Sequence, residues 1–163
     1  RHEIVPVVDM PLLRWMVELI DEESTEQQQL VLATYFAQQA LELHDQVKDC
    51  PNGSLARQLN VLAGDFASAQ FYKILARFPT DFSDRFGRTV QLVNGAKCTL
   101  ALDDEISVST WMEANFGLVK TFAELIGQTY LTSYGKQIIE QRATTLHKEQ
   151  REQLSALLAH AVA

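Results

Sequence analysis

The sequence predicts an all-α fold in a single domain, and three observations favour this. The chain has 163 residues, about the length of one domain with a real core. It contains only 7 glycines and 4 prolines, and so few helix breakers leave room for long helices. Apolar residues recur at helical spacing, and no segment alternates with period two long enough to indicate a strand. We therefore expect one helical bundle over residues 1–163, with an irregular segment at about residues 1–9.

Start and stop signals divide the chain into separate helices. Small polar residues precede the apolar periodic segments, where they can accept hydrogen bonds from the first free amides of a helix. Prolines, an Asn-Gly pair and acidic runs separate the segments. The expected N-caps are Asp9, Ser24 (in a capping box with Gln27), Ser54 and Thr80. The expected helices cover about residues 10–20, 25–48, 55–78, 81–102 and 108–126, followed by one long or two shorter helices from residue 128.

Apolar residues are unusually widespread on some of these helices. Leu55, Leu59, Leu62 and Phe66 share one stripe, the pattern of a helix face that packs against a neighbour. Residues 70–78 and 116–126 are apolar over more than half of their circumference. Such helices are buried in a large core or in a partner, and a chain of this length favours the partner.

Charge and composition argue against several functional classes. The formal net charge is −7, and no two Lys or Arg residues are adjacent, which disfavours nucleic-acid binding. The chain shows no signal-peptide pattern and no apolar run near the length of a transmembrane helix. Cys50 and Cys98 are isolated and form no C-x-x-C, so we expect free thiols in a reducing cytoplasm.

Asp45 and Asp49 are the strongest candidates for a metal site. Four residues apart on a helix, two carboxylates project from one face, about 5–6 Å apart at Cβ. Such a pair can contribute to a Mg²⁺ site. The same spacing is common on ordinary solvated helix ends, with His44 then a packing residue. Spacing alone favours the solvated helix end, so we expect no metal ion here.

The order of these residues carries a family resemblance. H-D-x-V-x-D at 44–49, a short breaker, and L-A-G-D at 62–65 together resemble trans-prenyl diphosphate synthases. Residues 58–68 and the later V-N-G-A-K at 93–97 are similar to the small, non-catalytic component 1 of heptaprenyl diphosphate synthases. The resemblance spans about residues 12–131 and implies a truncated trans-isoprenyl diphosphate synthase fold. Its motif positions are His44, Asp45, Gly64 and Asp65.

The departures from a catalytic synthase are as informative as the match. Gln46 stands where the second aspartate of D-D-x-x-D would be, and Lys48 adds a positive charge inside the motif. The loop at 50–55 lacks the paired arginines of catalytic members, and no second D-D-x-x-D follows. The resemblance therefore implies no catalytic residues and no cofactor in this chain, with Mg²⁺ expected in a catalytic partner.

The implied partner is the large subunit of a heterodimeric synthase that makes a C30–C35 prenyl diphosphate for the menaquinone side chain. This chain would support that subunit and its product length. The sequence leaves open whether it contacts the product within the complex and whether it forms a homodimer when alone. Aromatic and apolar residues favour interface centres. The expected interface residues, some of which must also serve this chain's own core, are Phe82, Phe86, Val90, Val93, Trp111 and Phe116.

Other patterns leave alternatives open. The acidic run 103–105 is a solvated turn or a second metal cluster, and Lys120-Thr121 resembles a diphosphate-binding pair of catalytic synthases or matches it by chance. Ala37 and Ala40 line a path for a growing chain in catalytic members, or simply pack a helix.

Two other functions compete with the subunit interpretation. One is a stand-alone Mg²⁺-dependent enzyme that acts on a diphosphate through Asp45, Asp49 and Asp103. The other is a helical adaptor with no isoprenoid connection.

Overall fold

The computed structural model describes residues 8–103 and 105–161, which fold into helices and contain no strand. The all-α prediction is confirmed. Of the expected irregular segment, residues 1–7 lie outside the described residues, and Val8 and Asp9 lead into the first helix. The elements are α1 (Met10–Leu19), α2 (Thr25–Val47), α3 (Leu55–Leu75), α4 (Thr80–Leu102), α5 (Val108–Leu125), α6 (Ser133–Arg142), the 3-10 turn η1 (Ala143–Thr145) and α7 (Lys148–His160).

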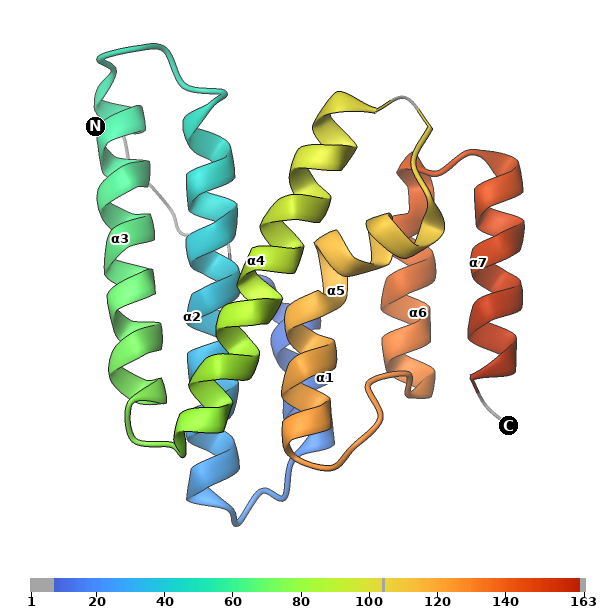
Figure 1. Cartoon of the computed structure of the whole chain (residues 1–163), viewed down its shortest axis with the longest axis horizontal. Coiled ribbons are helices and arrows are strands. Elements are labelled where there is room, and N and C mark those ends of the chain that lie inside the picture. The colour runs from blue at the N-terminus through green and yellow to red at the C-terminus, as the bar shows by residue number, and fades with distance from the viewer. Residues whose placement is uncertain (1–7, 104, 162–163) are drawn as a thin grey trace.

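Two antiparallel helix pairs form most of the molecule. Figure 1 shows α2 and α3 side by side at one end, α4 and α5 in the middle, and α6 and α7 at the other end. α1 lies behind α5 and packs against α2, α5 and α6. The centre is α5, because 11 of its 18 residues are buried. One hydrophobic core therefore connects helices from both ends of the chain.

The expected N-caps are confirmed at the first three helices. The side chains of Asp9, Ser24 and Ser54 each accept a hydrogen bond from the amide three residues on. The capping box at Ser24 is only half formed, because the Gln27 side chain accepts a bond from the Asp21 amide instead, at 2.7 Å. The Gln27 side chain thus accepts a hydrogen bond from the loop before α2, and Ser24 alone caps the helix.

Other boundaries differ from the predictions. Thr80 is the first residue of α4 rather than its cap, since the extended Pro79 precedes it and no side chain caps the helix. α3 ends at Leu75, three residues early, in a turn before that proline. The last segment forms two helices, because η1 interrupts the helical path between α6 and α7.

Trp15 joins the two ends of the chain. Its ring is fully buried against Phe116 of α5, and its Nε1 donates a 2.8 Å hydrogen bond to the carbonyl oxygen of Tyr130. The ring also lies against Gly135 of α6, where a Cβ atom would come within 2.4 Å of the indole. α6 can therefore approach α1 this closely only because residue 135 has no side chain.

We expect Gly135→Ala to lower the free energy of unfolding by about 1–3 kcal/mol, because overpacking a well-filled core forces side chains and backbone to move. Gly87→Ala in α4 is the matched control, since a Cβ there meets nothing within 4 Å. Replacing this helical glycine by alanine should raise the free energy of unfolding by about 0.5–1 kcal/mol. Urea unfolding followed by circular dichroism measures both, and equal effects would contradict the packing argument.

Tyr130 should make stability sensitive to alkaline pH. Burial, and then the nearby carboxylates of Glu113 and Glu124, raise the pKa of its phenol above the ordinary value of 10.0. As pH rises past about 10, the unfolded chain loses this proton while the folded chain keeps it, so stability falls. Tyr130→Phe should show a smaller fall in urea midpoint between about pH 8 and about pH 10.5 than the parent chain, and an unchanged slope would rule Tyr130 out as the cause.

Candidate functional site

Three of the four family-motif residues, His44, Gly64 and Asp65, come together where the end of α2 meets the middle of α3. His44 Nε2 lies 3.2 Å from Asp65 Oδ1, and both side chains are partly exposed. The His44 ring rests on Gly64, where a Cβ atom would come within 2.4 Å of it. Gly64 leaves room for the His44 ring, and Asp65 pairs with the ring nitrogen. This contact explains why the two parts of the motif occur at linked positions.

Asp45 faces the other way, toward α4. Its Oδ2 accepts a 2.5 Å hydrogen bond from Lys97 Nζ, and the lysine side chain is only 20% exposed against 47% for the aspartate. The carboxylate that the sequence offers to a metal ion is therefore bound by an ammonium group of the same chain.

Asp49 does not share a helix face with Asp45, contrary to the prediction. α2 ends at Val47, and Asp49 follows in a turn whose amide bonds back to Gln46. Within residues 8–103 and 105–161, no three His, Cys, Asp or Glu side chains gather as a metal ion would need. Among the described residues, Asp45 and Asp49 are thus not joined by a third side chain of a type that binds metal ions.

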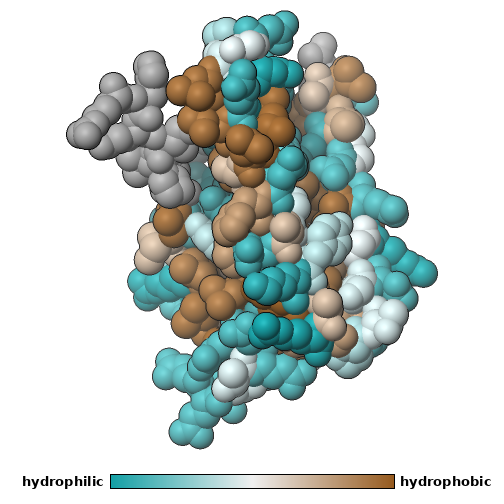
Figure 2. Space-filling view, turned by 90° about the vertical axis from the view of Figure 1, so that its left-hand side faces the viewer, coloured by the Kyte–Doolittle hydropathy of each residue, from teal (hydrophilic) through white to brown (hydrophobic). Residues whose placement is uncertain are grey.

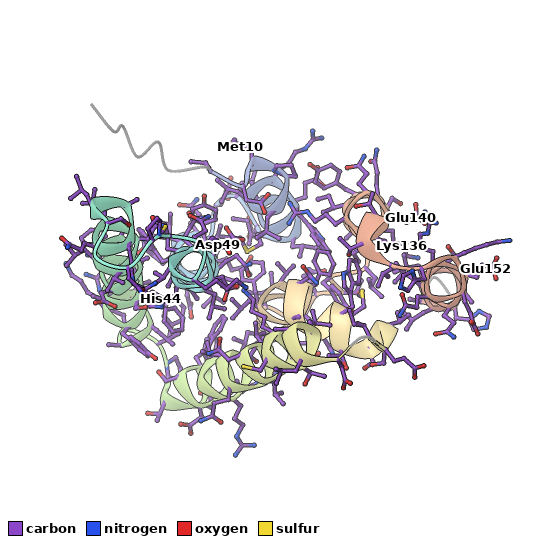
Figure 3. All side chains as sticks on the ribbon, turned by 90° about the horizontal axis from the view of Figure 1, so that it is seen from above. Met10, His44, Asp49, Lys136, Glu140 and Glu152 are labelled. Atoms are coloured by element: carbon purple, nitrogen blue, oxygen red, sulfur yellow. The ribbon has the colours of Figure 1, made fainter. Side chains whose placement is uncertain are left out.

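A cleft opens beside the Asp45–Lys97 pair, between the end of α2, α4 and α5. Its volume is about 540 Å³. Figure 3, which looks down on the molecule, shows His44 and Asp49 on the side of α2 and α3, and Lys136, Glu140 and Glu152 on the side of α6 and α7. The residues that line the cleft are Asp45, Lys48, Asn94, Lys97, Cys98, Leu100, Ala101, Ala114 and Asn115.

The remaining candidates are not among the residues that line this cleft. Thr121 is buried and shares a 2.6 Å hydrogen bond with the Thr89 hydroxyl, while Lys120 lines two other hollows on α5. The Lys-Thr pair is therefore not arranged around the Asp45 carboxylate. In the acidic run 103–105, residue 104 lies outside the described residues, and its two neighbours are exposed. Ala37 and Ala40 are buried in helix packing.

The expected partner interface needs correction. Phe86, Val93, Trp111 and Phe116 are at most 4% exposed, so they fill this chain's own core and leave no surface for a partner. Only Phe82 and Val90 are half-buried and keep some accessible surface. The sequence predicts that some of the six belong to this chain's own core, but aromatic and apolar character could not tell which, because core helices and interface helices share it.

A different apolar surface is exposed instead, on the outer side of α3. Leu62 and Phe66 are 63% and 61% exposed. α3 turns its small residues Gly64 and Ala67 toward the bundle, together with Phe71 and Leu75. Figure 2 looks onto this end of the molecule and shows brown, hydrophobic residues among hydrophilic ones. We call this surface the α3 outer face and define it as Leu55, Leu59, Leu62, Phe66 and Ala69.

The sequence held a signal for this orientation. A glycine inside a helix allows a neighbouring group to approach the backbone closely, so Gly64, next to the motif aspartate, indicates the side of contact. The stripe of larger residues around Leu62 lies on another side of the helix and is exposed there.

Comparison with known proteins identifies the family of this chain. Residues 1–162 match the family model described as heptaprenyl diphosphate synthase (HEPPP synthase) subunit 1. The chain belongs to this family. It is 37% identical over 86 residues to heptaprenyl diphosphate synthase component 1 of Geobacillus stearothermophilus, a match over 50% of this chain and 39% of that relative. The aligned part is thus well under half of the relative's length. No solved structure matches the chain.

None of the described helices is long and apolar enough to cross a membrane. The family resemblance inferred from the sequence is confirmed by the match, which extends over almost the whole chain.

A double-mutant cycle tests the motif contact. Gly64→Ala should cost about 1 kcal/mol of stability, since the new methyl displaces His44 from Asp65. In a His44→Ala background the clash is gone, so the same substitution should be neutral or stabilise by up to about 1 kcal/mol, as replacing a helical glycine does. Urea unfolding gives all four values. An identical cost in both backgrounds would mean that the histidine is not what Gly64 accommodates.

Proposed function

We propose that this chain is the non-catalytic small subunit of a heteromeric long-chain prenyl diphosphate synthase and docks on its catalytic subunit through the α3 outer face. The observation that carries this proposal is the exposure of Leu62 and Phe66 on that face. Membership of the subunit 1 family supports it, and so does the name of the bacterial relative, which is a component of a heptaprenyl diphosphate synthase.

The α3 outer face exposes large apolar side chains to water. Apolar surface costs about 25 cal/mol per Å² while it stays exposed, and a contiguous exposed patch usually marks an interaction site. α3 has 21 residues and so is about 30 Å long, enough to carry a helix-to-helix contact along one side. Its outer side chains are large and apolar at the centre, where interfaces hold their strongest contacts.

A catalytic role for this chain alone has little support in its side chains. Asp45 is paired with Lys97, and the described residues gather no set of carboxylates for Mg²⁺. We place the metal-binding carboxylates, and the Mg²⁺ they hold, in the catalytic subunit. The product is then a C30–C35 prenyl diphosphate for the menaquinone side chain, and the compartment is the cytoplasm, which the free Cys50 and Cys98 suit.

The stand-alone enzyme and the unrelated adaptor remain as alternatives. The enzyme would need Asp45, Asp49 and Asp103 around one ion, but Asp45 already binds Lys97. The adaptor has no observation in its favour that the family match does not explain better. Turnover by the pure chain would revive the first, and failure to bind any prenyl diphosphate synthase subunit would revive the second.

We expect Leu62→Glu and Phe66→Glu each to weaken binding to the cognate catalytic subunit at least about tenfold, because a charge would be buried in an apolar contact. Both residues are exposed, so the folded chain should keep its helicity and stability. Leu157→Glu on α7 is the control, since that leucine is 43% exposed on another helix.

Isothermal titration calorimetry measures the binding. Incorporation of isopentenyl diphosphate by the mixture, with each protein alone, measures the consequence. A loss with Leu157→Glu but not with the α3 variants would move the interface to another face. Full activity of the catalytic subunit alone, unchanged by mixing, would overturn the subunit role itself.

A further inference from the structure

We propose that Asn52, in the turn between α2 and α3, is a modification site where the side-chain amide is lost by spontaneous deamidation. The chain contains two Asn-Gly pairs, at 52–53 and 94–95. The structure places the first in an exposed turn and the second inside α4. Both pairs offer the same reacting groups, so the fold decides which of them reacts. This inference does not depend on the proposed function.

The reaction is an attack of a backbone nitrogen on a side-chain carbonyl carbon. The Gly53 nitrogen forms a bond to Asn52 Cγ, and the bond between Cγ and the side-chain nitrogen breaks. The side-chain nitrogen leaves as ammonia and takes the proton that the Gly53 nitrogen gives up, which leaves a five-membered succinimide ring. Water then opens the ring at Cγ, which gives aspartate, or at the main-chain carbonyl carbon, which gives isoaspartate. Water is the only co-reactant.

The turn at 51–54 presents both reacting groups to solvent. The Ser54 amide donates a 3.1 Å hydrogen bond to the Pro51 carbonyl oxygen, which closes a β-turn with Asn52 and Gly53 at its centre. Gly53 has a φ of 74°, a conformation that glycine adopts at little steric cost. Both central residues are exposed, and Figure 1 shows their loop at one end of the α2–α3 pair.

Few restraints act on the attacking nitrogen. Within the described residues, no backbone carbonyl accepts a hydrogen bond from the Gly53 amide. A Cβ atom at this position would meet nothing within 4 Å, so the space beside Gly53 is open. Glycine also has no side chain that could hinder the approach of Asn52 Cγ. The nitrogen can therefore reach the side chain with only the turn itself to distort.

The second pair is held against the same reaction. Asn94 and Gly95 lie inside α4, where each amide bonds to the carbonyl oxygen four residues earlier. The Gly95 nitrogen can approach the Asn94 side chain only if the backbone leaves the helical conformation and these bonds break. The pair therefore reacts only while α4 is locally unfolded. Gly95 is also exposed, with open space around it, so accessibility does not distinguish the two sites.

Modification changes the start of α3. Asn52 lies two residues before Ser54, the N-cap of that helix, so both products place a new carboxylate near the positive end of the helix dipole. Isoaspartate also adds one carbon atom to the main chain inside the ring that the Ser54–Pro51 hydrogen bond closes. The turn then has to rearrange, directly before Leu55, the first residue of the α3 outer face.

The chain supplies its own control for the test. Trypsin releases the two pairs in separate peptides, residues 49–57 and 89–97. The folded chain is incubated in mildly alkaline buffer, and mass spectrometry follows the replacement of amide by carboxyl in each peptide. We expect residues 49–57 to react at least about tenfold faster than residues 89–97, because α4 must open first. In urea that unfolds the chain, the two rates should become similar.

An isoaspartyl methyltransferase with a labelled methyl donor identifies the product. Label should accumulate in the parent chain and be lost in Asn52→Gln, whose longer side chain closes the corresponding ring far more slowly. Asn94→Gln is the matched variant and should leave the labelling unchanged. Circular dichroism checks that both variants are folded, and the peptide ratio of the parent chain keeps the test decisive if either is not.

Three results would overturn the proposal. If residues 49–57 stay unmodified in the folded chain, the turn protects Asn52. If residues 89–97 react as fast in the folded chain, the helix gives no protection. If urea leaves the ratio of the two rates unchanged, the neighbouring residues set the rates and the fold does not.

Discussion

The close packing of α3 on α2 decides what this protein presents to its surroundings. Gly64 has no side chain, so the His44 ring can lie directly on the α3 backbone and reach Asp65. In this middle part of α3 the small residues Gly64 and Ala67 face the bundle, while Leu62 and Phe66 point outward on the α3 outer face. The close approach at Gly64 thus fixes which side of α3 is exposed here.

Local signals predicted most of the fold. Asp9, Ser24 and Ser54 were identified as N-caps because a short polar side chain before an apolar periodic segment has one dominant use. The direction of each helix face was harder to predict, since periodicity says which residues share a side but not what that side meets. Phe86 and Phe116 were therefore assigned to a partner although they fill the core.

The candidate site shows the same division between local and long-range information. The sequence identified Asp45 and its neighbours but placed Asp49 on the same helix face, which needed α2 to extend beyond Val47. The partner that Asp45 does bind, Lys97, is 52 residues away and could be found only from the arrangement of α2 and α4. Its ammonium supplies the positive charge that a metal ion would otherwise bring, so a single carboxylate at this position needs no ion to be satisfied.

Two adjacent residues at the end of α2, His44 and Asp45, contact two different helices. His44 contacts α3, which carries the outer face, and Asp45 contacts α4, which lines the cleft. The two side chains therefore hold the end of α2 to two different neighbours, one through a histidine ring on a glycine and one through an ion pair. In this chain the H-D and G-D pairs are thus contacts between helices, which is a structural use that does not need a bound metal ion.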